Sequence, residues 1–475
     1  MITSEQFLER LRRMKDNIYM GGELIKRDNP QLMPGLRVIM LTYDLAADPQ
    51  YKGLFTAISH LDGKEINRFT HIQQSPEDLM KKQDMTRIGV QRTGFCIQRC
   101  MGIDAMNALS VVTKEVDEGK GTEYHQRFIE YLKYWQNNDI TAACAQTDVK
   151  GNRKLRPHQQ ADPDHYVRIV EKRKNGIIIR GAKNHITMAS QADEIVVVPT
   201  RTLTREEGDW AVAFAIPADA KGVKLVNRAV APRARKHLTS PLSELGCSDC
   251  FVIFEDTFVP WDRVFLAGET EFAGRLALMF ALYHRHSYCG CKPGVTDIMM
   301  GFTALVAEYH GLEKAQHIQH KIAEMIGVGE LIYAAGIAAA VRSEKSSSGT
   351  QIPNTIFANV GRRLAGENIY HEHNILADIS GGIPATLPFE EDFFAEETKD
   401  LLNKYIIHNE QIPAEDQHRC YRAISDIICS SFGGWSQIVG VHGGGSPIME
   451  TIALLTNYDL DGKKKIAKYI AGIKD

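Results

Sequence analysis

Residues 166–179, YVRIVEKRKNGIII, place a strong β-hairpin signal in the middle of a largely helix-like sequence. Runs of β-branched residues flank Lys174-Asn175-Gly176, and an Asn-Gly pair in that setting favours a tight hairpin turn. Further strand-like runs lie at 194–199, 210–216, 223–226 and 251–258. The middle of the chain, residues 141–272, is therefore predicted to form a compact β-domain.

Helical periodicity flanks this region on both sides. Thr3 and Gln6 are spaced for a capping box ahead of an apolar stripe. Helix-like stretches then lie at 91–116, 128–135, 304–309, 315–326, 331–341, 419–431 and 463–473. Gly311 and Gly327 are expected to interrupt the later helices. The order predicts a multi-domain α+β protein with an N-terminal helical domain (1–140), the β-domain (141–272) and a C-terminal helical bundle (273–475).

The composition is that of an ordinary globular protein. The chain has 475 residues, 44% of them hydrophobic, with a formal net charge of −3 at pH 7. With this slightly negative net charge, the sequence gives no indication of a basic surface for binding nucleic acid. The first residues have no secretory signal pattern, and no apolar stretch is expected to reach the ~18 residues that cross a bilayer. We therefore expect a soluble, cytoplasmic protein with neither nucleic-acid nor membrane partners.

Two groups of thiol and imidazole side chains are candidates for a metal site. Cys96 and Cys100 are four residues apart, which on one helix places them ~40° apart. His284 and Cys291 are seven apart, which places them ~20° apart. Together they offer three thiols and one imidazole, a set that zinc and iron–sulfur clusters both accept. Buried cysteines without a metal remain the simpler alternative.

A second grouping competes for the zinc assignment. Cys247 and Cys250 form a Cys-x2-Cys pair that could hold structural zinc together with Cys289 and Cys291. Spacing alone does not separate the two sites.

The motifs around these residues resemble those of the 4-hydroxybutyryl-CoA dehydratases, within the larger family that includes the flavin-dependent 4-hydroxyphenylacetate hydroxylases. The resemblance covers nearly the whole chain. It is carried by residues 40–46, 48–51, 66–69, 95–100, 147–151, 168–173, 180–183, 258–260, 283–285, 287–288 and 443–447. It implies an acyl-CoA dehydrogenase-like architecture with a middle β-barrel domain, and a homotetramer built as a dimer of dimers that binds FAD.

The resemblance also implies which residues bind the cofactors. A [4Fe–4S] cluster would be held by Cys96, Cys100, His284 and Cys291, a set that the related aromatic hydroxylases lack. The residues implied near FAD are Thr147, Asp148, Lys183 and Thr187, together with Gly443, Gly444 and Ser446 of the glycine-rich loop. The presence of all four cluster ligands favours the dehydratases over the oxygenases and disfavours the Cys247/Cys250 zinc site.

The implied reaction is the dehydration of a hydroxyacyl-CoA such as 4-hydroxybutyryl-CoA by a ketyl-radical mechanism. His284 would serve as ligand and base, Tyr288 would assist the leaving hydroxyl, and Lys292 would supply positive charge near the substrate. The sequence departs from the dehydratases where they have two glutamates, because Asp249 and Val439 occupy those positions. These two departures leave the identity of the acyl chain undetermined. They also allow a second activity, or a sole activity, in which the enzyme isomerises the double bond of an enoyl-CoA.

Two other hypotheses about the function remain. One is a flavin-dependent aromatic monooxygenase of the same family. The other is a zinc-stabilised acyl-CoA- or flavin-binding protein, or a redox sensor.

Overall fold

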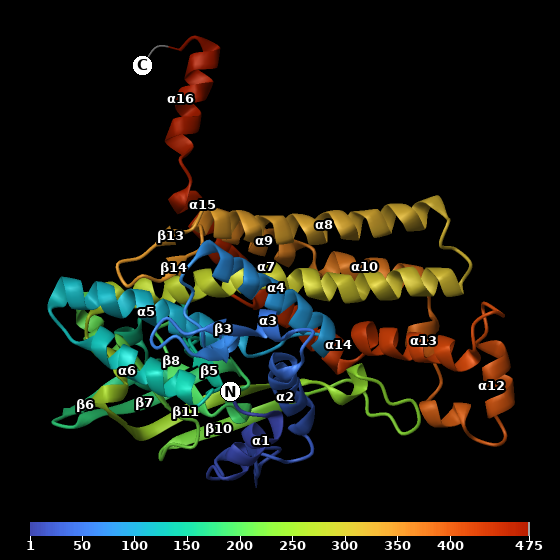
Figure 1. The fold of residues 1–475 in the computed structure, drawn as a ribbon, viewed down its shortest axis with the longest axis horizontal. Helices are drawn as coiled ribbons and strands as arrows, with labels where there is room; N and C mark the ends of the chain where they lie inside the picture. The colour runs from blue at the N-terminus through green and yellow to red at the C-terminus, as the bar shows by residue number, and fades with distance from the viewer. Residues whose placement is uncertain (474–475) are drawn as a thin grey trace.

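The computed structural model describes residues 1–473 and has helices at both ends of the chain with sheets between them (Figure 1). The N-terminal helices are α1 (Ser4–Arg12), α2 (Met33–Ala47), α3 (Lys52–Phe55), α4 (Pro76–Thr93), α5 (Cys100–Lys120) and α6 (Tyr124–Asn137). Thr3 and Gln6 form the predicted capping box at the start of α1. The N-terminal region also contributes strands, β1 (Ile18–Met20) and β2 (Glu23–Ile25), and the small β3 (Thr56–Ile58) and β4 (Glu65–Asn67) pair.

The predicted hairpin is present and forms one edge of the larger sheet. Arg173 pairs with Gly176 across the Lys174-Asn175 turn, joining β6 (Arg168–Arg173) to β7 (Gly176–Thr187). The six strands of this sheet are ordered β2-β1-β10-β11-β7-β6, with β10 at Val223–Val230 and β11 at Cys247–Pro260. A second sheet is ordered β12-β9-β8-β5, from β12 (Val264–Ala267), β9 (Val212–Pro217), β8 (Glu194–Val197) and β5 (Ala142–Ala145).

The expectation of a middle β-barrel is wrong. Hydrogen bonding in the larger sheet stops at β2 and β6, which do not pair with each other, whereas a barrel requires its outer strands to close with a defined stagger. The two open sheets instead pack their apolar faces together. Phe214 on β9 and Phe254 on β11 meet edge to face, with ring centroids 5.7 Å apart.

The C-terminal region is a helical bundle organised along one long helix. α7 (Thr270–Tyr309) is 40 residues long and lies alongside α4, α8 (Gln316–Val341) and α9 (Thr355–Glu367) (Figure 1). The remaining helices are α10 (Ile369–Ser380), α11 (Ile383–Thr386), α12 (Lys399–Tyr405), α13 (Ala414–Cys429), α14 (Ser431–His442), α15 (Pro447–Asn457) and α16 (Leu460–Ala471). The short strands β13 (Glu344–Lys345) and β14 (Gln351–Ile352) pair between α8 and α9. α16 projects away from the body of the molecule (Figure 1).

The glycine predictions are half right. Gly311 adopts φ +66° just beyond α7, where a left-handed residue ends the helix. Gly327 lies inside a continuous α8, because packing against α7 and α9 compensates for its weak helix propensity.

The predicted continuous helix over 91–116 is broken ahead of Cys100. α4 ends at Thr93 with Gly94 at φ +84°, and α5 begins only at Cys100. The intervening loop contains Gln98 at φ +63°. Cys96 and Cys100 therefore do not share a helix face, and the loop sets their approach instead.

Two segments, Gln316–Val341 and Ser431–Asn457, are long and apolar enough to cross a membrane by length and composition alone, contrary to the expectation from sequence. The first is α8, which packs its Ile332 in the bundle. The second is interrupted between α14 and α15 by the glycine-rich loop.

Candidate functional site

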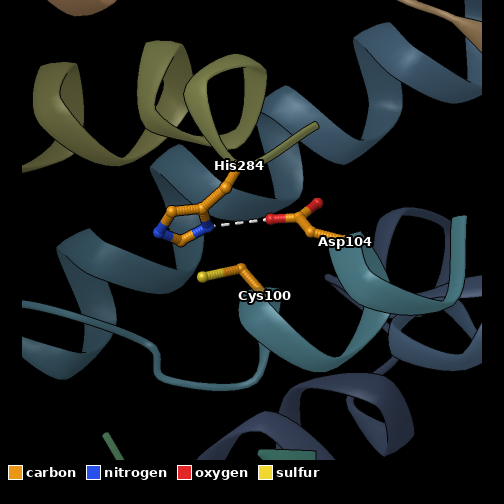
Figure 2. A group of neighbouring side chains, drawn as sticks. All are labelled: Cys100, Asp104 and His284. Carbon is orange, nitrogen blue, oxygen red and sulfur yellow. Dashed lines mark hydrogen bonds and ion pairs between the residues drawn. The ribbon is translucent and has the colours of Figure 1, made fainter. Parts of the chain in front are cut away.

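Cys100, Asp104 and His284 form a compact group where the start of α5 meets the middle of α7 (Figure 2). One ligand atom from each of the three lies within 4.8 Å of the others. Cys100 and Asp104 are one turn apart on α5, and His284 reaches them from α7. Two helices remote in sequence thus bring a thiol, a carboxylate and an imidazole together.

Asp104 is fully buried and bonded on both oxygens. Its Oδ1 accepts from Lys82 Nζ at 2.6 Å and from Ser287 Oγ at 3.0 Å, and its Oδ2 lies 2.9 Å from His284 Nδ1. Burial alone would raise the pKa of Asp104, but the Lys82 ammonium and the His284 bond outweigh it and hold that pKa below its usual value. Asp104 is therefore an ionised acceptor with little capacity left to bind a metal itself.

The ionised Asp104 selects the tautomer of the His284 imidazole. A carboxylate only accepts, so His284 Nδ1 must donate to it, and in the neutral ring Nε2 is then the nitrogen that carries the lone pair. The His284 ring also stacks on Phe280, with centroids 5.7 Å apart and planes 7° apart. This is the arrangement that orients histidine ligands in metal sites.

Cys100 lies beside this imidazole, and Cys96 and Cys291 lie near Cys100, while the group within 4.8 Å contains only Cys100 of the three thiols. Cys100 is buried, while Cys96 and Cys291 are partly exposed. A hydrogen bond from the Cys100 thiol lowers the pKa of Cys96, while that bond and burial raise the pKa of Cys100. Burial and the nearby Cys96 raise the pKa of Cys291. Three thiols with one oriented imidazole suit a soft metal or an iron–sulfur cluster.

Of the other zinc candidates, Cys250 and Cys289 are bonded elsewhere: Cys250 Sγ lies 3.2 Å from Asn227 Oδ1 on β10, and Cys289 Sγ lies 3.4 Å from the Arg285 carbonyl. Cys247 lies nearer, since burial, Asp249 and the nearby Cys96 raise its pKa. Within residues 1–473, the metal-capable group of three includes none of these cysteines, and of the predicted thiol ligands it includes Cys100 but not Cys96 or Cys291.

Tyr288 and Lys292 both lie on α7 but face different partners. Tyr288 donates its hydroxyl hydrogen to the Gly440 carbonyl at 2.7 Å, and its ring lies 4.3 Å from the Arg362 guanidinium. Lys292 is buried in an ion pair with Glu372 of α10, a partner that the sequence did not indicate. The charge of Lys292 is thus neutralised by Glu372.

Asp249 links the sheet to the C-terminal helices. Its Oδ1 accepts from Thr187 Oγ1 at 2.6 Å, and its Oδ2 accepts from Trp435 Nε1 at 2.6 Å. The Asp249 charge also opposes the lowering of the Cys96 pKa that the Cys100 hydrogen bond causes. The carboxyl therefore lies close to the thiol group, between one residue implied for flavin and a tryptophan that sequence analysis missed.

The other residues implied for flavin form a bonded junction between β5 and β7. Lys183 Nζ lies 2.9 Å from Asp148 Oδ2 and donates to the Gln146 carbonyl at 2.8 Å. Asp148 also bonds Thr200, and the Thr147 carbonyl accepts from Asn184 N at 2.8 Å. Both charged side chains are buried and committed to each other, so at this junction backbone and hydroxyl groups are what remain for a cofactor.

The glycine-rich loop is held against the site by two arginines. Arg362 Nε donates to the Gly443 carbonyl at 2.7 Å, and Arg285 Nε donates to the Gly444 carbonyl at 3.0 Å. Gly444 has φ +79°, and a Cβ built there would lie 3.7 Å from His284 Cδ2. The loop backbone therefore approaches the imidazole closely. Ser446 is exposed at the start of α15.

A buried carboxyl that the sequence did not indicate lies beyond this loop. Glu450 is the one buried residue of α15, and its Oε1 lies 3.6 Å from Arg362 Nε without a hydrogen-bond partner within residues 1–473. Burial raises the pKa of Glu450 above its ordinary value. Glu450 is a single carboxyl in a mostly apolar helix, so the sequence of α15 gives no periodic signal that could have identified it as the buried residue.

Fold and site together define a multi-domain α+β protein of acyl-CoA dehydrogenase-like architecture with a thiol–imidazole group between its N-terminal helices and C-terminal bundle. A glutaryl-coenzyme A dehydrogenase shares this fold at TM-score 0.50 and 13% identity, covering 86% of this chain and 82% of that one.

The chain belongs to the 4-hydroxyphenylacetate 3-hydroxylase family. The profile described as 4-hydroxyphenylacetate 3-hydroxylase N terminal matches residues 3–266, and that described as C terminal matches residues 273–472. The resemblance found from the sequence motifs is thereby confirmed.

Relatives from two kinds of enzyme match along the full length. The 4-hydroxybutyryl-CoA dehydratase/vinylacetyl-CoA-Delta-isomerase of Clostridium aminobutyricum is 38% identical, covering 100% of both chains. The solved archaeal 4-hydroxybutyryl-CoA dehydratase from N. maritimus superposes with TM-score 0.95 at 36% identity, covering 100% of this chain and 95% of that one. The oxygenase component of 4-hydroxyphenylacetate 3-monooxygenase, solved in complex with FAD, gives TM-score 0.88 at 25% identity, covering 99% and 98%.

Proposed function

We propose that this protein is an FAD- and [4Fe–4S]-dependent lyase that dehydrates a 4-hydroxybutyryl-CoA-like thioester and also moves the double bond of the enoyl product. The observation that carries the proposal is the meeting of Cys100 with the oriented His284 imidazole, with Cys96 and Cys291 near Cys100, in a chain 38% identical to a dehydratase.

The donor set fits the implied cluster. Cys96, Cys100, Cys291 and His284 Nε2 would hold it, and Asp104 is not needed as a ligand because its oxygens are already bonded. Thr187 and the Thr147 segment of the sheet, with the glycine-rich loop, would line the flavin. When bound, the cluster supplies a Lewis acid for the hydroxyl group and the flavin supplies one-electron chemistry.

The chain's own residues orient the substrate and move its protons. His284 Nε2 accepts a proton when it is not engaged as a ligand, because Asp104 holds Nδ1 in its donating state. The Tyr288 hydroxyl, one turn from His284, gives up its bond to the Gly440 carbonyl to donate to the departing hydroxyl. Lys292 acts through its buried pair with Glu372, which sets the position of α10 against α7.

Three further features belong to the same proposal. The acyl chain is close to 4-hydroxybutyryl in size, with Asp249 performing the role that glutamate has in the dehydratases. The enzyme assembles as a homotetramer, a dimer of dimers. It works in the cytoplasm.

Metal and flavin analysis of anaerobically purified protein tests this function. About four irons, about four sulfides and one FAD per chain are expected, together with anaerobic turnover of a hydroxyacyl-CoA from a panel of thioesters. Zinc without iron would contradict the cluster assignment.

The second candidate is a flavin-dependent aromatic monooxygenase, which the similarity to the FAD-bound oxygenase component supports. It predicts iron-free protein that binds reduced flavin loosely and hydroxylates a phenol in the presence of oxygen. The same preparation assayed with each substrate class separates the two functions.

A further inference from the structure

A cavity of about 430 Å³ lies between the end of α4, the loop over residues 231–246, α7 and α13. One wall is apolar and is formed by α7, through Ile298, Phe302, Leu305 and Tyr309. These residues are spaced four, three and four apart, so they lie along a single stripe of the helix. The cavity is thus an elongated slot parallel to α7, of a volume typical of small-molecule sites.

Three segments of the chain lead from this slot to the thiol group. Gly94 lines the cavity two residues before Cys96, and Leu245 lines it two residues before Cys247, whose thiol interacts electrostatically with Cys96. On α7, Ile298 lies seven residues beyond Cys291 and therefore on the same side of the helix. One end of the slot is consequently directed at the proposed reaction site.

The length of the slot along α7 suits an extended ligand. From Ile298 to Tyr309 the helix rises about 16 Å. A pantetheine arm, about as long as four or five residues of extended peptide, spans roughly 15 Å. Its methylene and dimethyl groups match the apolar wall.

The charged lining is strongly biased toward arginine. Arg92, Arg235, Arg419 and Arg422 line the cavity, and Asp416 is the single carboxylate that does so in the described part of the chain. Arg235 pairs with Asp426, and Arg419 pairs with Glu415 at 2.7 Å. Arg92 forms no ion pair among residues 1–473, and its guanidinium lies 5.8 Å from the centroid of the Tyr51 ring.

Arg422, unlike Arg235 and Arg419, forms no ion pair among residues 1–473. Burial and the adjacent Arg235 lower the pKa of Arg422 to about 10. Arg422 donates to the Pro388 carbonyl at 2.6 Å rather than to a carboxylate. An incoming phosphate would therefore gain charge-assisted hydrogen bonds here.

We propose that this slot binds the coenzyme A part of the substrate, with the pantetheine arm along α7 and the phosphates against Arg92 and Arg419. The proposal rests on the proposed function for its choice of an acyl-CoA. FAD also has phosphates, but Thr147, Asp148, Lys183 and Thr187 are absent from the lining of this cavity. The slot is thus separate from the surface implied for flavin.

The test compares the holoenzyme with Arg92→Gln/Arg419→Gln and with Ala423→Trp, which fills the slot from α13. Arg363→Gln is the matched control, because Arg363 forms an exposed pair with Glu367 outside the cavity. Binding of acetyl-CoA is measured by equilibrium dialysis. KM and kcat are measured for 4-hydroxybutyryl-CoA and for its N-acetylcysteamine thioester, which lacks the phosphates.

The dissociation constant for acetyl-CoA should rise about tenfold for each arginine removed, and Ala423→Trp should weaken binding further. KM for the CoA thioester should rise much more than KM for the N-acetylcysteamine thioester, and iron and flavin content should stay at the level of the control. Unchanged acetyl-CoA affinity in both cavity variants would overturn the proposal, as would loss of flavin from the arginine variant.

The binding assay separates this inference from the proposed function. Weakened acetyl-CoA binding in a protein that turns over neither thioester would support the slot while contradicting the dehydratase. Normal turnover with unchanged binding would support the dehydratase while contradicting the slot.

Discussion

One buried charged group bonds His284 directly and another holds the glycine-rich loop next to it, and the two groups differ in how completely their polar atoms are bonded. In the Asp104 group, Lys82, Ser287 and His284 occupy both carboxylate oxygens. In the Arg362 group, Arg362 Nη1 and Glu450 Oε1 have no hydrogen-bond partner within residues 1–473. A fully bonded network holds one geometry. An incompletely bonded network retains the free-energy cost of its unsatisfied polar atoms, which a ligand, a water molecule or a small movement of the side chains can relieve.

The comparison assigns different tasks to the two groups. The Asp104 group lies on three long helices, α4, α5 and α7, and fixes the imidazole, which suits a permanent ligand site. The Arg362 group holds a glycine-rich loop whose backbone lies next to the same imidazole, which suits a surface that adapts when cofactor or substrate binds.

Removing a thiol beside the Asp104 group should have the largest effect. Cys96→Ala is expected to lose iron and activity together, because a cluster deprived of one of its ligands is not retained. Iron and sulfide analysis with an anaerobic assay measures this. Cys289→Ala is the matched control, since Cys289 is buried on α7 but bonds the Arg285 carbonyl. Full activity in Cys96→Ala would show that the cluster assignment is wrong.

Tyr288 lies between the two groups and should affect rate rather than metal content. Tyr288→Phe keeps the ring against Arg362 and removes only the hydroxyl. A fall in kcat of about 10²- to 10⁴-fold with unchanged iron is expected for a lost proton donor. Single-turnover kinetics and the visible spectrum measure the two properties separately. Loss of iron in this variant would instead indicate a structural role.

Breaking the bonded network tests whether Asp104 orients the ligand. Asp104→Asn should weaken iron binding about 10- to 100-fold and destabilise the fold by about 3–5 kcal/mol, because Lys82 is left as an unpaired buried charge. Iron retention under a chelator and denaturant unfolding measure these effects.

Two companion variants separate the causes. Lys82→Met/Asp104→Asn should recover most of the stability but not the iron affinity. Asp297→Asn breaks the Arg87 pair between α4 and α7 away from the site and should keep the iron. Iron affinity of the wild-type level in Asp104→Asn would show that the carboxylate does not orient His284.

Substitution of Glu450, in the incompletely bonded Arg362 group, should have the smallest effect of the four predictions. Burial raises the pKa of Glu450, so the folded state holds this proton more tightly than the unfolded state does. Stability contributed by the protonated form is present below the unfolded pKa and declines as pH rises toward the folded pKa. Glu450→Gln should remove that decline and change unfolding free energy near neutral pH by no more than about 1 kcal/mol.

Unfolding free energies of wild type and Glu450→Gln, measured from about pH 4 to pH 8, check this prediction. Parallel pH profiles for the two proteins would contradict it. A large loss of activity in the variant would show that Glu450 belongs to the reaction site and not to the adaptable loop.

The sequence by itself determined those features that depend on neighbouring residues. Asn175-Gly176 set the hairpin, and the switch between helical and strand periodicity set the helix–sheet–helix order. The family could be identified from its motifs because these combine residue types at short, fixed spacings. Cys96 with Cys100 and His284 with Cys291 were identifiable as two candidate pairs for the same reason, whereas the assignment of all four to one cluster stays a prediction.

Tertiary structure alone decided which side chains face one another across the chain. The Asp104–His284 bond, the Lys292–Glu372 pair and the approach of Glu450 to Arg362 join residues 180, 80 and 88 positions apart. The open form of the sheet depends on pairing by β1 and β2 from the N-terminal region, and the loop at Cys96 on packing that outweighs helical periodicity. Local propensity is worth only tenths of a kcal/mol to about 1 kcal/mol per residue, so burial and long-range bonding decide these features.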